Sequence, residues 1–370
     1  MKLLILSAST GGGHNMRANA LHDWWIGRGG SAKVYHPLET SFIGYRFGCS
    51  LYNFIQRKLP FMHFAYFYFL EFASMHRGSG RIVGSSKFLK VCSEFQPRLV
   101  VSMHSHLNHG YFDLLRIKIS QTLPFAVYCG ELADGLGFSR HWINPSNNLF
   151  AGPTEECCQA AQKRGMPAGK CLNAGPLLRK SFYKKTAISR KTVLEEYNLD
   201  PKVSTYLLTT GANGVNNHKK VIQSLIESGE NCQVIALCGT NVRDFNELER
   251  SCYQSSKVKV VPLKTVNDSQ MADFLKIVDC VFARPGAGSS TEALVSGCPI
   301  IFDLSKGIMP QETNNLNYWK KYSEKPLFCR KPSSFPKLIK YLRNDNALSL
   351  PFEDSPKSFL SALENLADWK

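Results

Sequence analysis

The sequence predicts an α/β protein with two domains, each built on a parallel sheet with crossover helices. The chain has 370 residues, of which 44% are hydrophobic, so it is longer than one ordinary domain and can bury a large core. Short apolar runs alternate with helix-like stretches from end to end, which is typical of parallel sheets. The runs expected as strands are 2–8, 32–36, 98–103, 124–129, 204–210, 232–238, 257–262, 278–283 and 298–303.

The domain boundary is expected where the character of the sequence changes, between Gly175 and Ser204. There a Gly-Pro pair is followed by a basic segment and a short polar helix near 193–197. The second half then reopens with a strand that runs into a glycine loop, so each half begins as a Rossmann-like unit. Ser355-Pro356 is typical of the start of a last helix, which we expect to run to about Trp369. We therefore predict a first domain at 1–178, a linker at 179–203, a second domain at 204–350 and a C-terminal helix at 351–370.

The charge balance indicates an anionic partner, because 45 Lys and Arg against 29 Asp and Glu give a formal net charge of +16. The chain has no zinc-finger spacing, RNP-like motif or tandem basic helix, so nucleic acid is not the expected partner. Anionic lipid headgroups and phosphorylated small molecules remain. The twelve cysteines form no C-x-x-C pair and indicate reduced, packed thiols. With no secretory signal and no membrane-spanning run, we expect a cytoplasmic protein, free or on the cytosolic face of a membrane.

The first candidate site is Gly11-Gly12-Gly13-His14, between the first expected strand and the helix-like stretch 15–25. A glycine turn lets the backbone approach a ligand closely, and a helix N-terminus offers N–H groups. The positive end of the helix dipole would lower the pKa of His14, and a neutral imidazole can accept a proton from a hydroxyl. The alternative is a tight turn whose histidine caps the helix or packs.

The stretch from Phe54 to Phe72 departs from this pattern, because it carries eight aromatic residues between basic flanks. Arginines and lysines precede it, and more follow between Arg77 and Lys90. Aromatic rings with cationic flanks suit a membrane interface. A helix packed in the core of the first domain is the equally weighted alternative.

In the second half, the segment 278–294 predicts a strand, a glycine turn and a helix start. The N–H groups of Ser289, Ser290 and Thr291 could hold a phosphate, and Glu292 could accept both hydroxyls of a ribose. The alternative is a capping box of Ser289 and Glu292, which satisfies the helix end without a ligand.

Two further groups of polar residues follow expected strands. Gln311, Glu312 and Asn315 offer donors and acceptors that suit sugar hydroxyls, although an exposed polar turn explains them equally well. His104, His106 and His109 follow the strand at 98–103 and could ligate zinc, but a structural or cleft-lining role is the favoured interpretation.

Taken in order, these segments resemble the glycosyltransferases that move a sugar from a uridine diphosphate donor to a membrane lipid. The resemblance is to the diacylglycerol glucosyl- and galactosyltransferases, and more distantly to the peptidoglycan lipid intermediate glycosyltransferase. It spans most of the chain. The matching segments are 7–14, 142–145, 173–176, 283–294 and 310–315.

The resemblance implies a GT-B fold, in which two Rossmann-like domains face each other across a cleft. The second domain would bind the UDP-sugar, and the first would bind the lipid acceptor and dip its aromatic stretch into an anionic membrane. The implied donor residues are Gly211, Gly214, Val261, Leu263, Gly286, Gly288, Ser289, Ser290, Thr291, Glu292, Gln311, Glu312 and Asn315. The implied acceptor residues are Gly12, Gly13, His104 and Trp142, with His14 as the base. No metal or other cofactor is implied, and the chain has no D-x-D pair of the kind that holds a catalytic divalent ion.

The sequence departs from its look-alikes in the first domain. They carry an aspartate after the fourth strand and a histidine three residues before the tryptophan, where this chain has Glu131, Asp134 and Ser139. Because the resemblance is to inverting enzymes, it implies a direct, inverting transfer of a hexose to the hydroxyl of diacylglycerol or a glycosyl-diacylglycerol, with His14 oriented by Glu131 or Asp134. A UDP-sugar epimerase of the same fold and a non-catalytic UDP- or lipid-binding relative are the alternatives.

Overall fold

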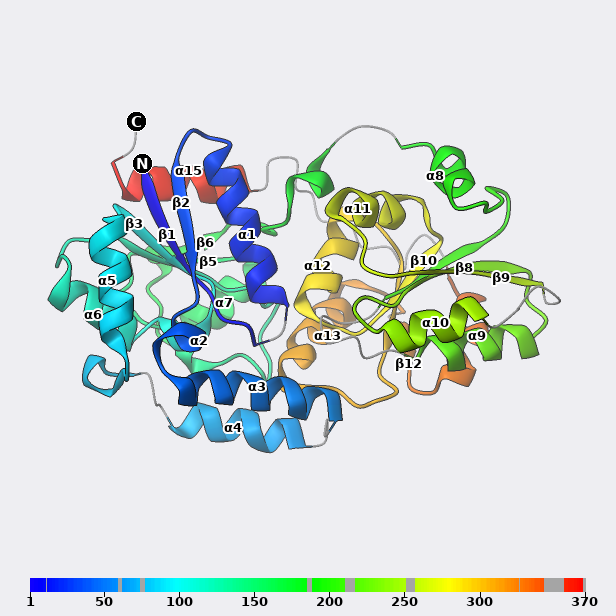
Figure 1. Cartoon of the computed structure of the whole chain (residues 1–370), viewed down its shortest axis with the longest axis horizontal. Coiled ribbons are helices and arrows are strands. Elements are labelled where there is room, and N and C mark those ends of the chain that lie inside the picture. Colours follow the sequence, from blue (N-terminus) through cyan, green and yellow to red (C-terminus); the bar gives the residue numbers. More distant parts are fainter. Residues whose placement is uncertain are drawn as a thin grey trace. The chain divides into compact units, whose positions relative to one another are not determined.

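The computed structural model describes residues 1–10, 12–58, 62–73, 77–184, 188–209, 217–250, 257–325, 327–342 and 356–368. The chain divides into two compact units. Unit 1 consists of Met1–Lys180, Met309–Tyr318 and Phe352–Lys370, and unit 2 consists of Ser181–Ile308 and Trp319–Pro351. Both units have parallel sheets flanked by helices (Figure 1), so the predicted α/β class with two Rossmann-like domains is confirmed.

Unit 1 is built on a six-stranded parallel sheet of order β2-β1-β3-β4-β5-β6. Its strands are β1 (Lys2–Leu6), β2 (Ser31–Tyr35), β3 (Leu99–Ser102), β4 (Phe125–Tyr128), β5 (Leu149–Gly152) and β6 (Cys171–Asn173). Its helices are α1 (Gly13–Ile26), α2 (Pro37–Ser41), α3 (Ile43–Lys58), α4 (His63–Ala73), α5 (Ser85–Phe95), α6 (Gly110–Lys118), α7 (Glu155–Lys163) and α15 (Lys357–Leu366). Its 3₁₀ turns are η2 (Ser79–Arg81), η3 (Ser105–Leu107), η4 (Arg140–Trp142), η5 (Ala168–Lys170) and η6 (Lys180–Tyr183). The turn η6 continues into unit 2.

Alternate residues of the strands supply two separate cores, because successive side chains of a strand point to opposite faces of the sheet. On β1, Leu4 and Leu6 belong to a cluster with residues of α5, α6 and α7. Leu3 and Ile5 belong to a second cluster with residues of α1 and α15. The sheet is therefore buried on both faces, which explains why its strands read as continuous apolar runs.

The helix α15 belongs to unit 1, although it lies near the end of the chain. Phe359, Leu360 and Leu363 are fully buried in the same core as β1. Arg28 donates from Nη1 to both carboxylate oxygens of Glu364 at 2.7 Å. A last helix was predicted, but its association with the first domain was not, and residues 351–355 and 369 lie outside the part of the chain that the structure describes.

Unit 2 has a six-stranded parallel sheet of order β12-β11-β10-β7-β8-β9. Its strands are β7 (Thr205–Leu208), β8 (Cys232–Leu237), β9 (Val258–Leu263), β10 (Cys280–Ala283), β11 (Ile300–Asp303) and β12 (Leu327–Cys329). Its helices are α8 (Arg190–Glu196), α9 (His218–Glu227), α10 (Val242–Arg250), α11 (Asp268–Ile277), α12 (Ala287–Ser296) and α14 (Phe335–Ile339), with the 3₁₀ turn η8 (Pro332–Ser334). The strand order reverses direction between β10 and β7, and ligands of open α/β sheets bind at such a point.

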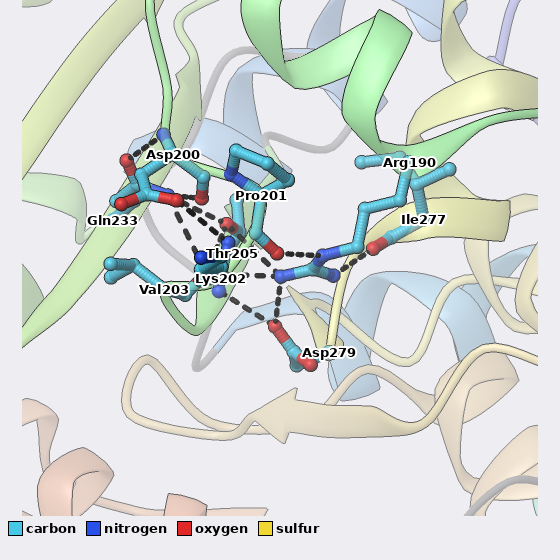
Figure 2. Close-up of polar contacts among 9 residues, drawn as sticks. All are labelled: Arg190, Asp200, Pro201, Lys202, Val203, Thr205, Gln233, Ile277 and Asp279. Atoms are coloured by element: carbon cyan, nitrogen blue, oxygen red, sulfur yellow. Dashed lines mark hydrogen bonds and ion pairs between the residues drawn. The ribbon is translucent and has the colours of Figure 1, made fainter.

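A polar network around Arg190 stabilises the segment that leads into β7 (Figure 2). Its guanidinium donates to the carbonyl oxygens of Pro201 at 3.1 Å and Val203 at 3.0 Å, and it pairs with Asp279 at 2.9 Å. Asp279 also accepts from the backbone N–H of Thr205 at 2.7 Å. The network thus joins α8 to the starts of β7 and β10.

Helix α13 (Pro310–Tyr322) differs from the predicted domain division. Its residues 310–318 group with unit 1, and its residues 319–322 group with unit 2. The sequence predicted that all of 204–350 belongs to the second domain. The predicted sugar-binding residues Gln311, Glu312 and Asn315 therefore belong to unit 1.

Candidate active-site residues in the two units

His14 lies in the first turn of α1, whose N-cap is Gly12. Its Nδ1 is 2.6 Å from the carbonyl oxygen of Met103, at the end of β3. A carbonyl oxygen only accepts, so this contact places a proton on Nδ1 and leaves Nε2 as the basic nitrogen of the neutral ring. Burial, followed by the charge of Arg17, lowers the pKa of His14 to about 4. The predicted direction of this shift is confirmed, but its main cause is burial.

Two predicted acceptor residues surround His14. The ring of His104 is 4.6 Å from that of His14, edge to face, and the ring of Trp142 is 6.0 Å away. His104 itself contacts the hydroxyl of Thr10 through Nε2 at 2.8 Å. The structure therefore brings together His14, His104 and Trp142, which the sequence places on three separate segments.

Arg17 acts by its charge on His14 and on Glu131, one of the two carboxylates predicted to support His14. This arginine is buried on α1, and its Nη2 donates to the carbonyl oxygen of Gly130 at 3.2 Å. Burial raises the pKa of Glu131 to about 7, although Arg17 and a hydrogen bond from Asn314 act in the opposite direction. Arg17 could not be selected from the sequence, because an arginine within a helix usually lies on its solvent-exposed face.

The start of α13 packs on the loop that carries Glu131. Asn314 donates to Glu131 Oε2 at 3.3 Å and accepts from the N–H of Gly137 at 3.2 Å. Asn315 accepts from the N–H of Leu132 at 3.4 Å, and Glu312 accepts from the N–H of Met309 at 2.8 Å. Both are buried, so the alternative of an exposed polar turn is wrong.

Gln311 is the third predicted sugar-binding residue of this group, and its hydrogen bonding differs from that of the other two. Its amide nitrogen lies 3.5 Å from the hydroxyl of Tyr52. Its buried side-chain oxygen has no hydrogen-bond partner among the described residues. A ligand hydroxyl would satisfy it, whereas Glu312 and Asn315 already hold the local fold together.

Asp134 lies apart from these contacts. Its carboxylate pairs with Arg164 at 2.6 Å and accepts from the N–H of Gly135 at 2.8 Å. Burial acts to raise the pKa of Asp134, but the hydrogen bond and charge of Arg164 outweigh it, so the net shift is downward. Within the described residues, no contact joins Asp134 to His14. The charge of Arg17, in contrast, acts on both Glu131 and His14.

The other two members of the predicted histidine group, His106 and His109, lie near His141. The ring of His106 is 5.5 Å from that of His104 and 4.9 Å from that of His141. Burial lowers the pKa of His109 to about 4. Over the ranges described, no group of three or more His, Cys, Asp or Glu residues has the arrangement of a metal site.

Helices α3 and α4, with the residues just before each of them, carry an exposed apolar surface, called here the α3–α4 surface. The two helices lie side by side (Figure 1). Of the predicted aromatic stretch, Phe67 is buried, so part of it does pack in the core. The exposed members of the surface are Phe42, Ile43, Phe47, Phe54, Met62, Tyr68, Phe69 and Phe72. The exposed cations Arg46, Arg77, Arg81, Lys87 and Lys90 come from the same helices and the segment after them. None of the described helices is both long enough and apolar enough to cross a bilayer.

In unit 2, the predicted phosphate site is the N-terminus of α12, directly after β10. The helix begins at Ala287, two residues earlier than predicted, with Gly286 as its N-cap and no side-chain capping bond. Ser289 is therefore inside the helix, and the alternative of a capping box with Glu292 is wrong. The first N–H groups, including that of Gly288, point out of the helix end. Ser290, Thr291 and Glu292 are buried, and the hydroxyl of Ser290 has no partner among the described residues.

Neighbouring strand ends add polar groups that the sequence analysis did not select. Asn217, before α9, donates to Asp303 at 2.8 Å and to Ser305 at 2.6 Å. Arg284 donates to the carbonyl oxygen of Gly307 at 2.9 Å. Burial lowers the pKa of Lys306, with Asp303 opposing and Arg284 adding to the shift. Their positions follow from the parallel sheet, whose carboxyl ends share one edge, but no short motif marks them.

Two predicted uracil contacts, Val261 and Leu263, are partly buried on β9 at the edge of the sheet. Gly13 is partly buried at the start of α1, close to Arg17. Gly11, Gly211 and Gly214 lie outside the described residues.

No family model matches this sequence. The probable monogalactosyldiacylglycerol synthase 2 of Oryza sativa subsp. japonica is 25% identical over 337 residues, which cover 85% of this chain and 68% of that protein. Among solved structures, Acinetobacter baumannii MurG has a TM-score of 0.60 at 12% identity, with 99% of both chains covered. A Neisseria meningitidis UDP-GlcNAc 2-epimerase bound to UDP-GlcNAc has a TM-score of 0.56 at 12% identity, covering 99% of this chain and 100% of that one.

These likenesses confirm two predictions made from the sequence. The structural matches, with the two parallel six-stranded sheets, confirm the GT-B fold. The sequence match extends over 85% of the chain, in agreement with the family resemblance predicted from the sequence. The chain is thus similar in sequence to the monogalactosyldiacylglycerol synthases and has the fold of GT-B glycosyltransferases.

Proposed function

We propose that this protein transfers a hexose from a UDP-sugar to the hydroxyl of a diacylglycerol-type membrane lipid, with inversion at the anomeric carbon. The observation that carries the proposal is the fixed tautomer of His14. The Met103 carbonyl holds the Nδ1 proton, so Nε2 is available to take a proton from an acceptor hydroxyl. The similar protein of Oryza sativa is named a probable monogalactosyldiacylglycerol synthase, a name that contains the diacylglycerol acceptor.

The transfer would proceed by direct displacement. Nε2 of His14 takes the proton of the acceptor hydroxyl as its oxygen bonds to the anomeric carbon. The bond between that carbon and the diphosphate oxygen breaks, and UDP leaves with the electron pair. Among the two carboxylates considered, Glu131 is favoured over Asp134 as the supporting residue, because Glu131 shares Arg17 with His14.

Unit 2 would bind the donor. The uncapped N-terminus of α12 offers backbone N–H groups to the diphosphate, and Arg284 lies just before it. Glu292, buried in the second turn of α12, would accept the ribose hydroxyls, as the resemblance implies. We expect no bound metal to be needed, because the helix end and nearby cations offset the charge of the leaving diphosphate.

The α3–α4 surface would hold unit 1 on an anionic bilayer. Eight exposed apolar side chains and five exposed cations on and beside α3 and α4 match the apolar interior and anionic headgroups of such a membrane. The bilayer is the favoured occupant because the net charge of +16 is complementary to anionic lipid. We therefore place the protein at the cytosolic face of a membrane.

The test is incubation with a panel of UDP-sugars and vesicles that contain diacylglycerol and an anionic lipid, followed by mass analysis of the lipids. A new glycolipid, made by the wild type and reduced at least about a hundredfold in His14→Ala, supports the proposal. The exposed His22 provides the matched control, and His22→Ala should keep full activity. Full activity in His14→Ala would remove the assigned base.

Two rival functions give different results in the same assay. An epimerase, favoured by the fold likeness to UDP-GlcNAc 2-epimerase, would convert the UDP-sugar without lipid. A non-catalytic relative would bind uridine diphosphate and produce no glycolipid. Addition of EDTA tests the expected independence from metal, since a metal-dependent transfer would stop.

A further inference from the structure

We propose that Glu71 is a positioning residue. It fixes the position of the acceptor residues near His14 relative to the membrane that α4 would contact. The inference rests on the proposed function and deepens it, because it names the residue that couples lipid binding to the acceptor site. Its basis is a set of contacts between one carboxylate on an otherwise apolar helix and the segment that carries Trp142.

Glu71 has an unusual place on α4. The helix sequence is HFAYFYFLEFA, in which Glu71 is the one carboxylate. Its neighbours Phe69 and Phe72 are 60% and 77% exposed, whereas the Glu71 side chain is only 13% exposed. A carboxylate loses hydration when it is buried, so it is retained at such a position only where hydrogen bonds replace the water.

Those hydrogen bonds come from η4 and the residue before it. Glu71 Oε1 accepts from the hydroxyl of Ser139, and Oε2 accepts from the backbone N–H of Arg140 at 3.1 Å. The carbonyl oxygen of Glu71 contacts Nε2 of His141 at 3.2 Å. The guanidinium of Arg140 donates to the same carbonyl and lies 6.0 Å from the ring of Phe72. One helical residue therefore holds three consecutive residues of the acceptor side.

The next residue along the chain is Trp142, which packs near His14. Trp142 is 3% exposed, and its ring is 6.0 Å from that of His14. On the opposite side of η4, Asn108 donates to the carbonyl oxygens of His141 at 3.2 Å and Trp142 at 3.4 Å. With both sides held, a displacement of α4 is transmitted through Glu71 to the tryptophan beside the base.

The geometry explains what a lipid surface would change. Phe69 and Phe72 would enter the membrane, and Glu71, on the same turn, would fix the distance from that membrane to η4 and Trp142. The acceptor hydroxyl of a diacylglycerol lies at the bilayer surface, so its distance from His14 depends on this depth. A small misplacement of reacting groups costs up to about a hundredfold in rate.

The experiment compares wild type, Glu71→Ala and Glu71→Gln with the matched control Glu155→Ala. Glu155 is an exposed carboxylate on α7 of the same unit, outside the α3–α4 surface and its cations. Each protein is tested for sedimentation with phosphatidylglycerol vesicles, for kcat and KM on long-chain diacylglycerol in those vesicles, and for kcat and KM on a water-soluble short-chain diacylglycerol. Amide hydrogen exchange of residues 139–142 is measured with and without vesicles.

If Glu71 positions the site, both variants sediment like the wild type. The ratio of kcat/KM on vesicle acceptor to that on soluble acceptor falls by about tenfold or more in Glu71→Ala, with a smaller fall in Glu71→Gln, which keeps one acceptor oxygen. Vesicles slow the exchange of 139–142 in wild type and Glu155→Ala but not in Glu71→Ala. An equal fall on both acceptors, or vesicle protection unchanged in Glu71→Ala, would overturn the inference. A wild type inactive on both acceptors would refute the proposed function, while the exchange measurement still decides the role of Glu71.

Discussion

Arg17 occupies the space that a side chain at Gly130 would need. Its guanidinium donates to the carbonyl oxygen of Gly130 at 3.2 Å, and a Cβ atom at position 130 would lie 2.0 Å from the central carbon of the guanidinium. Arg17 is buried, so its guanidinium has little room to move away. The absence of a side chain at position 130 therefore lets Arg17 lie where its charge acts on both His14 and Glu131.

We expect Gly130→Ala to displace Arg17 and to reduce sugar transfer by about tenfold or more, with a loss of about 1–3 kcal/mol in the free energy of unfolding. Steady-state kinetics and urea unfolding measure the two effects. Gly169→Ala is the matched control, because no atom lies within 4 Å of its added Cβ. Wild-type kinetics in Gly130→Ala would show that the position of Arg17 does not matter for activity.

Glu131 predicts a pH dependence near neutrality. Its pKa of about 7 is raised by burial, so the carboxylate forms as the pH passes through about 7. An ionised Glu131 stabilises the imidazolium that forms when His14 takes a proton, so kcat/KM should rise with pH across this range. The neutral form of His14 is already present there, because its pKa is about 4.

The pH profile of kcat/KM checks this assignment. In Glu131→Gln the rise near pH 7 should disappear. In Asp134→Asn it should remain, since that carboxylate is paired with Arg164. The opposite pattern would assign the supporting role to Asp134.

His218 should contribute to acid sensitivity of unit 2. Its pKa is lowered to about 4 by burial, against an ordinary value of 6.5. Between these values the unfolded chain binds a proton that the folded chain does not, so stability falls as the pH decreases from about 6.5 to about 4. Urea unfolding across this range should show a slope that is smaller by about one proton in His218→Gln. That variant can keep the contact of Nε2 with the Leu237 carbonyl, which is 2.8 Å in the wild type. An unchanged slope would contradict the assignment.

The network around Arg190 predicts a local stability effect (Figure 2). Arg190→Ala removes its hydrogen bonds to Pro201 and Val203 and its ion pair with Asp279, so we expect a loss of about 1–3 kcal/mol in the free energy of unfolding. The side chain is partly exposed, which keeps the effect below that of a fully buried pair. Lys191→Ala, which removes an exposed pair with Glu195 at 3.9 Å, should change stability by less than about 0.5 kcal/mol. Equal losses in both variants would show that the network adds nothing.

The fold was largely predictable from the sequence, because each expected strand is mostly apolar and lies in one of the two parallel sheets. The three strands that the prediction missed are β5, β6 and β12, of which β6 and β12 have only three residues each and lie at sheet edges. Such short runs carry too little periodicity to stand out from loops. The boundary between the domains was harder, because nothing in the sequence of 309–318 indicates that its buried asparagines bind the loop of Glu131.

Of the candidate site, His14 could be predicted from the sequence, because an imidazole in a glycine turn at a helix start is unusual. Arg17 and Glu71 could not, since a charged residue in a helix usually faces solvent and only the tertiary contacts reveal its burial. Asn217 and Asp303 were missed for a different reason, because their contact joins segments 86 positions apart in the sequence.

The packing of α15 has a consequence for how the protein is made. Phe359, Leu360 and Leu363 complete the core that begins with Leu3 and Ile5. During synthesis, unit 1 therefore cannot close its core until residues beyond 356 have left the ribosome. All of unit 2 emerges before that point, so the first half of the chain to be translated is the last to finish folding.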